Sequence, residues 1–310
     1  MPPVLYLVAG FVVLFFSGDW LVKSSVELAR HLKVSTLVIG ITVVAFGTSA
    51  PELLVSLRAV YDGSADISVG NVVGSNIANI ALVLGMVSII YPVKVRKKGV
   101  WFDWLIMMAA TISLIVASQN FNLSSAEGLV FLTILGVYLV WAVYSSRQQS
   151  KEGDDIRPPS MKMWKVIGLF MIAAAGLYFG ADWLVVGAKT IARKFDVSER
   201  VIGITIVAFG TSVPELATSL IAAFKKETDI SIGNIIGSNI FNIWAILGIT
   251  ATLKPININP SMVTNDYWWM AGIALMLLLM ILPLAKGLIS RWKGAIMLAV
   301  YILYIYLLFI

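Results

Sequence analysis

The sequence predicts an all-α integral membrane protein whose ten transmembrane helices form two inverted repeats of five helices. The first observation is composition: 59% of the 310 residues are hydrophobic and 13% are charged, whereas soluble domains carry about 25% charged residues. The second is that apolar stretches long enough to cross a hydrocarbon core of about 30 Å recur along nearly the whole chain. The third is a long internal repeat that relates one half of the chain to the other.

The expected spans lie near residues 4–28, 36–59, 69–91, 100–118, 126–145, 166–189, 201–223, 231–253, 267–285 and 294–310. We expect the first to be a membrane span and not a signal peptide, because no basic residues precede it and no clear small-residue cleavage motif follows. The second and seventh spans contain a proline, the third and eighth are rich in glycine, and the others are largely continuous apolar runs.

Residues 146–163 form the only strongly hydrophilic segment of the sequence. This segment is too short for a folded domain and is typical of a flexible linker. It separates a first half, residues 1–145, from a second half, residues 164–310. Because each half has an odd number of spans, the two halves are expected to cross the membrane in opposite directions.

Lys and Arg residues indicate the orientation, because they concentrate on the cytoplasmic side of membrane proteins. With both termini outside, sixteen of them fall on the inner side and six on the outer side. We therefore expect a multi-pass protein of the cell membrane with a cytoplasmic linker. The net charge of +6 is then an orientation signal, and it does not indicate a nucleic-acid partner.

The internal repeat has a constant offset of 163 residues. Residues 38–57 and 201–220 are identical at sixteen of 20 positions, and residues 66–85 and 229–248 at 13 of 20. Each copy places one glutamate, Glu52 or Glu215, within an apolar stretch, directly after a proline. The proline leaves backbone carbonyls without their helical donors, and within a membrane such groups need protein, water or an ion.

Serine and threonine hydroxyls next to each proline add further oxygen atoms. A proline kink with hydroxyls bonded back to the backbone is the structural alternative. However, an ionised carboxylate at mid-membrane costs roughly 3 kcal/mol or more, and two such acids at equivalent positions favour a functional site.

The third and eighth spans supply polar groups at helical spacing. In each copy a serine and an asparagine lie four residues apart: Ser75 and Asn79, Ser238 and Asn242. Residues four apart share one helix face, so each pair can point toward the same site. Asn76 and Asn239 are expected to face a different side. The alternative is that all of these groups form hydrogen bonds between closely packed helices.

The donor atoms determine which ion such a site would hold. Carboxylates, hydroxyls, amide oxygens and backbone carbonyls are hard oxygen ligands, and the chain has no cysteine and a single histidine, His31. Zinc, copper and iron therefore lack their preferred ligands. Calcium accepts six to eight oxygens in adaptable geometry, whereas magnesium requires a tight octahedron. Two carboxylates neutralise one divalent ion, which favours calcium, with sodium or protons as the competitor.

The GTSxPEL and GNxxGSNIxN motifs, each present twice, resemble the two repeats of the sodium/calcium exchanger family within the cation/calcium antiporter superfamily. The resemblance implies that helices two, three, seven and eight enclose the ions while helices one and six slide past them. Backbone carbonyls of Ala45, Ala208, Thr48 and Thr211 are implied as ligands. The implied ion ligands are Ala45, Thr48, Ser49, Glu52, Ser75, Asn79, Ala208, Thr211, Ser212, Glu215, Ser238 and Asn242.

The resemblance implies a secondary antiporter that exchanges sodium for calcium by alternating access. Three sodium ions against two carboxylates would leave a net charge of +1 and calcium would leave zero, so transport is expected to be electrogenic. The ions are cargo, and no resident cofactor and no obligatory protein partner are expected. A proton/calcium antiporter is the alternative, followed by a calcium-permeable channel. An enzyme is not expected, because no hydrolytic motif is present.

One position departs from some of the family. Several prokaryotic relatives and the potassium-dependent branch have aspartate where this chain has Asn242, which argues against potassium transport. The linker is also too short for the calcium-sensing domains of animal exchangers. Asp19 and Asp182 occupy matching positions in the first and sixth spans. They are expected to be structural, with Asp19 reaching Lys23 one turn on, and a role in ion access is the alternative.

Overall fold

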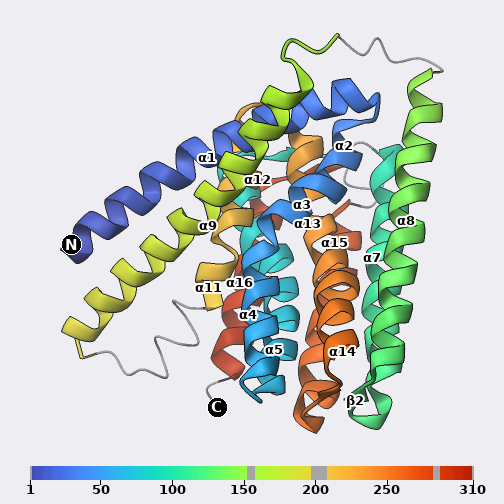
Figure 1. Cartoon of the computed structure of the whole chain (residues 1–310). Helices are drawn as coiled ribbons and strands as arrows, with labels where there is room; N and C mark the ends of the chain where they lie inside the picture. The colour runs from blue at the N-terminus through green and yellow to red at the C-terminus, as the bar shows by residue number, and fades with distance from the viewer. Residues whose placement is uncertain (1, 96, 152–157, 197–207, 282–286, 309–310) are drawn as a thin grey trace.

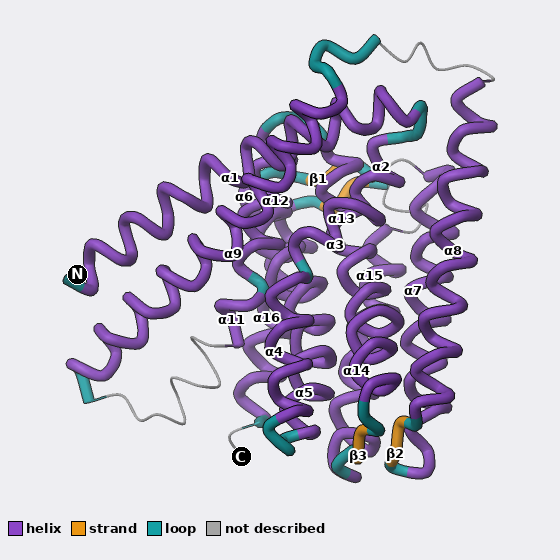
Figure 2. The backbone as a smooth tube through the Cα atoms, in the orientation of Figure 1, coloured by secondary structure: helices purple, strands orange, loops and turns teal. Residues whose placement is uncertain are grey.

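The computed structural model of the chain describes residues 2–95, 97–151, 158–196, 208–281 and 287–308. Within these residues the structure is a bundle of helices, and the four strands are two residues long each. Figures 1 and 2 show two long tilted helices on one side of the molecule and a bundle of more upright helices beside them.

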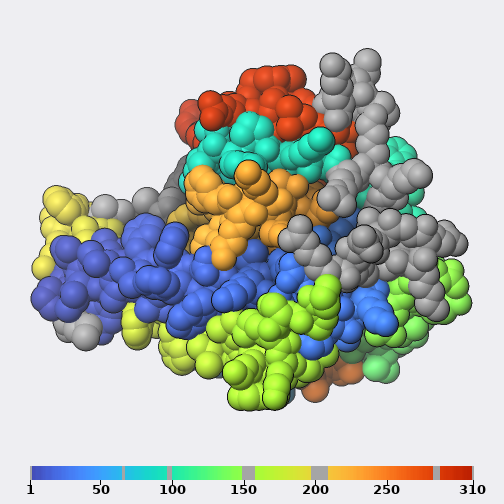
Figure 3. All heavy atoms as spheres, turned by 90° about the horizontal axis from the view of Figure 1, so that it is seen from above, coloured from blue at the N-terminus to red at the C-terminus, as the bar shows by residue number. Residues whose placement is uncertain are grey.

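The tilted pair consists of α1 (Pro3–Leu32) and α9 (Met163–Lys194). The two helices lie side by side, and seen from above they extend beyond the rest of the bundle (Figure 3). Glycine permits this close approach: a Cβ atom on Gly10 would lie 2.8 Å from the carbonyl oxygen of Gly180. Small residues at helix contacts bring backbones together in membrane proteins.

Each copy of the repeat begins with a broken helix. In the first copy the helix comprises four consecutive segments: α2 (Thr36–Ile39), the π-helical η1 (Gly40–Val44), α3 (Ala45–Thr48) and α4 (Ala50–Tyr61). The direction changes by 46° between its two parts. In the second copy α11 (Ala208–Thr211) precedes α12 (Val213–Phe224), and residues 197–207 lie outside the described residues.

The two breaks have the same backbone conformation. Ser49 has φ −85° and ψ 6°, and Ser212 has φ −87° and ψ 1°. Both precede a proline by two residues, and a proline cannot donate to the preceding turn. In the first copy, where both parts of the helix are described, the predicted interruption at the proline is therefore confirmed.

Two further helices fill the centre of the molecule. The first comprises α5 (Ala65–Ile77), the π-helical η2 (Ala78–Leu84) and α6 (Gly85–Ile90). The second comprises α13 (Thr228–Phe241), the π-helical η5 (Asn242–Leu247) and α14 (Gly248–Leu253). Both change to π geometry at equivalent places, next to Asn79 and at Asn242. Such π segments often occur at functional sites.

The remaining helices surround this centre: α7 (Lys97–Ala117), η3 (Ser118–Asn120), α8 (Ser125–Lys151), η6 (Met262–Asp266), α15 (Tyr267–Ile281) and α16 (Arg291–Leu307). Short strands join the two halves: β1 (Val93–Lys94) pairs antiparallel with β4 (Leu288–Ile289), and β2 (Asn122–Leu123) with β3 (Ile256–Asn257). Figure 2 shows β1 at one end of the bundle and β2 and β3 at the other.

Within the described residues, seven helices are long and apolar enough to cross a membrane, or eight if the bent helix of residues 36–61 counts as one span. The outward faces of these helices expose many large apolar side chains, as lipid-facing surfaces do. The chain is therefore a multi-pass membrane protein. Of the other two predicted spans, 201–223 is described only from residue 208 and includes the shorter apolar helix α12, and 294–310 corresponds to the 17-residue α16.

The end of the predicted linker contacts the end of α1. The helix α8 continues to Lys151, six residues past the predicted end of its span, and residues 152–157 lie outside the described residues. Glu27, only 4% exposed, accepts hydrogen bonds from the backbone nitrogens of Ser160 and Met161 at 2.6 and 3.1 Å. The sequence did not indicate this contact between the residues that precede α9 and the end of α1.

The prediction that Asp19 reaches Lys23 was wrong. Asp19 forms an ion pair of 2.6 Å with Lys225, at the end of α12, and Lys23 is exposed. The reason is the close packing of α1 on α12: a Cβ on Gly18 would lie 2.5 Å from Cδ1 of Ile221. Because this packing brings Lys225 to Asp19, the acid pairs across helices instead of within its own helix.

Candidate ion-binding site

Two glutamates from different halves of the chain lie at the centre of the helix bundle. Glu52 lies in the first turn of α4 and Glu215 in the first turn of α12, and both are completely buried. The Ser49 hydroxyl donates to Oε1 of Glu215 over 3.3 Å. Both carboxylate oxygens of Glu52 and Oε2 of Glu215 lack a hydrogen bond of good geometry within the described structure. Buried charge without a partner is very costly, so these oxygens are suited to a cation.

Hydroxyl groups of both halves surround the Glu215 carboxyl. Thr48 and Ser238 lie beside it, together with Ser49. The Thr48 hydroxyl is also within 3.3 Å of the Ala45 carbonyl oxygen and 3.4 Å of the Ser238 hydroxyl. The helix break therefore brings a backbone carbonyl, three hydroxyls and a carboxylate from both halves of the chain into one group of oxygen atoms.

The two asparagines of the π segments are completely buried as well. Neither the oxygen nor the nitrogen of the Asn79 side chain has a partner among the described residues, and the Asn242 oxygen has none. The Asn242 nitrogen donates to Oδ1 of Asn76 over 3.0 Å. These two amide oxygens are therefore available to a ligand, one from each half of the chain.

The expectation that Asn76 and Asn239 face a different side is only partly right. Asn239 donates to the carbonyl of Ile235 in its own helix at 2.8 Å. Asn76, in contrast, contacts Asn242 and also donates to the backbone of Asn239 over 3.2 Å. The helix becomes π-helical after Ile77, and the altered number of residues per turn changes which side chains share a face.

Sequence reasoning missed one supporting asparagine in each copy. Asn71 donates to the Glu52 carbonyl oxygen at 3.2 Å and to the Ser56 hydroxyl at 3.1 Å. Asn234, its equivalent at the repeat offset, donates to Ser219 at 3.1 Å, and its oxygen accepts from Thr48 at 3.0 Å. The signal that could have found them was present, since both belong to the repeated GN pair of the motif.

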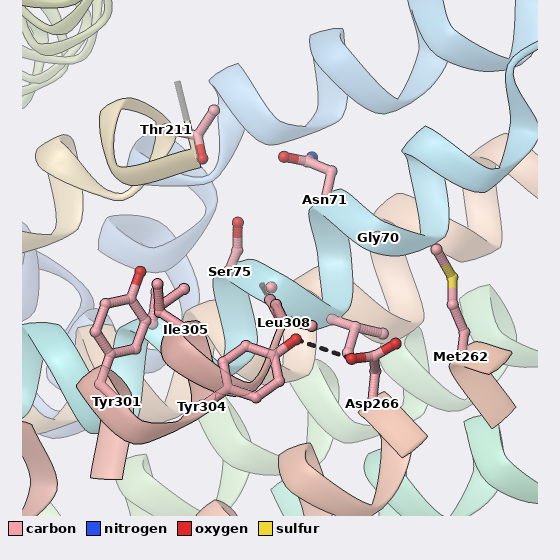
Figure 4. Close-up of a pocket in the computed structure, with 13 residues that line it drawn as sticks. Gly70, Asn71, Ser75, Thr211, Met262, Asp266, Tyr301, Tyr304, Ile305 and Leu308 are labelled. Carbon is pink, nitrogen blue, oxygen red and sulfur yellow. Dashed lines mark hydrogen bonds between the residues drawn. The ribbon is translucent and has the colours of Figure 1, made fainter. Parts of the chain in front are cut away.

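The remaining predicted ligands occupy two surroundings. Ser212 is completely buried and its hydroxyl has no partner among the described residues. Ala208 begins α11. Ser75 and Thr211 line a cavity of about 270 Å³ between α5, α11, η6 and α16 (Figure 4). Its other polar lining groups come from Asn71, Asp266, Tyr301 and Tyr304.

The two copies differ in how closely their glycine-rich helices are packed. Added Cβ atoms on Gly233 and Gly237 of α13 would lie 2.7 Å from the Leu37 oxygen and 2.6 Å from the Ile41 Cα. At the equivalent positions of α5, a Cβ on Gly70 would meet only Met262, and one on Gly74 would meet nothing within 4 Å. The helix α13 is therefore tightly packed at Gly233 and Gly237, whereas α5 is loosely packed at Gly70 and Gly74, where the cavity lies.

The chemistry of the site is that of hard oxygen donors. Among the described residues, no three side chains of His, Cys, Asp and Glu come together as a cluster that could hold a metal. Two carboxylates with hydroxyl, amide and backbone oxygens match the requirements of calcium, and the same groups are poor ligands for zinc or copper.

Comparisons with known proteins agree with this chemistry. The sequence model of the family described as sodium/calcium exchanger protein matches residues 2–144 and 165–310. The membrane protein MJ0091 of Methanocaldococcus jannaschii is 38% identical over 298 residues, which cover 96% of this chain and 95% of that protein. The sodium/calcium exchanger MaX1 of Methanosarcina acetivorans is 29% identical, with 98% of each chain covered.

A solved structure has the same fold. The sodium-calcium exchanger NCX_Mj, soaked with sodium and without calcium, superimposes with a TM-score of 0.84 at 36% identity, covering 98% of both chains. The family match extends over almost the whole chain apart from the linker, and it includes both copies of the repeat. The chain belongs to the sodium/calcium exchanger family.

Proposed function

We propose that the protein is a secondary antiporter that exchanges sodium for calcium across the cell membrane. The observation that carries this proposal is the pair of buried glutamates, Glu52 and Glu215, whose oxygens are mostly without hydrogen bonds. Two carboxylates balance the charge of one calcium ion, and sodium, which is also liganded by oxygen, can replace it. Exchange of one calcium for three sodium ions would move net charge, so that transport is electrogenic.

The proposed ligand set joins both halves of the chain. It comprises Ala45, Thr48, Ser49, Glu52, Ser75, Asn79, Ala208, Thr211, Ser212, Glu215, Ser238 and Asn242. The contacts of Glu215 with Ser49 and Thr48, across the two copies, support a single shared site. Potassium is not part of the proposal, because Asn242 adds no further negative charge.

The proposed topology has ten spans, five in each half, with both termini outside and the linker of residues 146–163 in the cytoplasm. The first half comprises residues 1–145 and the second half residues 164–310. The strand pairs β1–β4 and β2–β3, each of which joins one half to the other, lie at opposite ends of the bundle. This placement is consistent with halves that cross the membrane in opposite directions, as is the distribution of Lys and Arg.

Alternating access is supported by the difference between the two copies. The helix α13 is tightly packed at Gly233 and Gly237, whereas α5 is open at Gly70 and Gly74. Repeats of similar sequence in unlike surroundings are typical of transporters that move between two states. In the proposed topology the cavity beside α5 is on the outer side.

A proton/calcium antiporter is the second candidate, because the same two carboxylates could bind protons instead of sodium. The discriminating experiment is calcium uptake into liposomes that contain the purified protein. A sodium gradient without a pH gradient should drive uptake, and a pH gradient without sodium should not. Uptake driven only by the pH gradient would establish the second candidate, and uptake without any gradient coupling would indicate a channel.

A further inference from the structure

Each half of the chain carries an aspartate–tyrosine pair outside the central group of oxygens. The Tyr138 hydroxyl of α8 donates to Oδ1 of Asp103 in α7 over 3.0 Å. The Tyr304 hydroxyl of α16 donates to Oδ1 of Asp266 in η6 over the same distance. Neither pair belongs to the repeated motifs, and neither was identified from the sequence.

The two pairs occupy equivalent places in the two halves. Asp103 and Asp266 have the repeat offset of 163 residues. The tyrosines are 166 residues apart, and so are Gly128 and Gly294, which lie in the first turns of the same two helices. A Cβ on Gly128 would lie 2.7 Å from the carbonyl oxygen of Gly248, and one on Gly294 would lie 2.6 Å from that of Gly85. Because Gly85 and Gly248 are themselves equivalent, Tyr138 and Tyr304 are equivalent too.

The two aspartates differ in how much of each side chain is covered. The glycine-rich helices α5 and α13 differ in the same way. Asp103 is 7% exposed. Asp266 is half-buried and faces the cavity of about 270 Å³ that also contains Ser75 and Thr211 (Figure 4). Of the two equivalent aspartates, Asp103 is therefore covered by the protein and Asp266 is open to a cavity.

The cavity connects Asp266 to the proposed ion ligands. Among the described residues that line it, Asp266 has the only carboxylate. Ser75, at 4% exposed, makes no side-chain hydrogen bond to another described residue and is directed into this space in Figure 4. The remaining lining is mainly apolar, including Met262 and Ile305. A single negative charge with low-dielectric walls concentrates cations in such a space.

We propose that Asp266 is an access site for the transported cation: it binds the ion in the cavity before the ion reaches Ser75 and Thr211. Asp103 is the corresponding access site on the opposite face. Tyr304 holds Asp266 through one carboxylate oxygen, so that the side chain keeps its position beside the cavity. This inference rests on the proposed transport function. It adds a second cation-binding site, of lower affinity than the central site.

The structural alternative is that each aspartate serves only as the acceptor for its tyrosine. Tyr304→Phe removes the hydrogen bond and keeps the charge, whereas Asp266→Asn removes the charge and keeps a group that can accept the bond. If Asp266 is an access site, transport depends on its negative charge. If the contact is purely structural, the protein depends on the hydrogen bond between Tyr304 and Asp266. The two variants therefore separate the two explanations.

The experiment measures calcium transport in liposomes of known protein orientation, with the calcium concentration varied on one side at a time. Asp266→Asn should raise the apparent KM on the cavity side by about fivefold, without changing the maximal rate or the KM on the other side. The increase should shrink at high concentrations of choline chloride, because salt screens the charge. Asp103→Asn should raise the KM on the opposite side only.

Asp62→Asn is the matched control, because Asp62 is an exposed acid in the turn between α4 and α5. Its KM should stay within about twofold of the unmodified protein, as expected of a screened surface charge. Tyr304→Phe keeps the negative charge of Asp266, so its KM should rise by less than that of Asp266→Asn. An unchanged KM for Asp266→Asn, or an equal change for Tyr304→Phe, would overturn the access site. If the unmodified protein itself does not transport calcium, the proposed function fails instead, and the two failures are thus distinguishable.

Discussion

The Ser49 hydroxyl donates a hydrogen bond of 3.3 Å to Oε1 of Glu215. The two residues belong to different copies of the repeat and stand at the proline breaks of different helices. The break in the first copy therefore supplies a hydrogen-bond donor to the acid in the first turn of α12, in the second copy. Both halves of the chain therefore contribute residues to the site, so a substitution in either half should affect ion binding.

Replacing either central acid should nearly abolish calcium transport. Glu52→Gln and Glu215→Gln each remove half of the negative charge that balances a divalent ion, in surroundings where charge is poorly screened. Both variants should remain folded, because losing a buried charge does not harm the insertion of the helix. Calcium uptake into liposomes measures the first effect, and gel filtration in detergent measures the second. Near-normal uptake by either variant would refute the assignment of that glutamate.

The supporting asparagines should affect ion affinity more than folding. Asn71→Ala removes the donor to the Glu52 carbonyl oxygen, and Asn234→Ala removes the contacts with Ser219 and Thr48. Loss of such outer partners lowers metal affinity by about tenfold or more. The apparent KM for calcium should rise accordingly in both variants. A normal KM combined with a lower melting temperature would instead show that these asparagines only stabilise the fold.

Two equivalent glycines should respond differently to the same substitution. Gly237→Ala places a Cβ 2.6 Å from the Ile41 Cα, whereas Gly74→Ala meets nothing within 4 Å. Overpacking costs about 1–3 kcal/mol, so Gly237→Ala should lower the melting temperature and Gly74→Ala should not. Thermal unfolding of both variants, followed by fluorescence in the same detergent, tests this difference. Equal losses in the two variants would mean that the copies are packed alike.

Asn242→Asp should make calcium transport depend more strongly on pH. The substitution places a third carboxylate among the residues that contact the central site, and like charges near one another favour protonation of one of them. Protons then compete with calcium, so transport should fall as the pH is lowered from about 8.5 to about 5.5. The unmodified protein should change less over this range. Superimposable pH profiles would show that position 242 does not face the ions.

Much of the fold could be predicted because membrane helices have long apolar segments and the repeat is strongly marked. The break at Pro51 and the burial of both glutamates follow from local chemistry, and the structure confirms them. The partner of Asp19 and the partners of Glu27 outside its own helix could not be predicted, because these residues, Lys225 and Ser160, lie far away in the sequence.

The residue types that gather at the candidate site could be predicted from the sequence, but the directions of all their side chains could not. Helical spacing places Ser75 and Asn79 on one face only if the helix stays α-helical, and it becomes π-helical at Ala78. Asn76 also accepts a hydrogen bond from Asn242, which sequence spacing alone did not indicate. The unequal packing of α5 and α13 was also beyond prediction, because their sequences are nearly the same.

The central claim is that one group of buried oxygens binds calcium and sodium in turn. The most direct test is calcium binding to the purified protein at increasing sodium concentration and constant pH, with Glu215→Gln as the reference. Sodium should displace calcium competitively from the unmodified protein, and Glu215→Gln should bind little calcium at any sodium concentration. Calcium binding that is unaffected by sodium, or that persists unchanged in Glu215→Gln, would contradict the account.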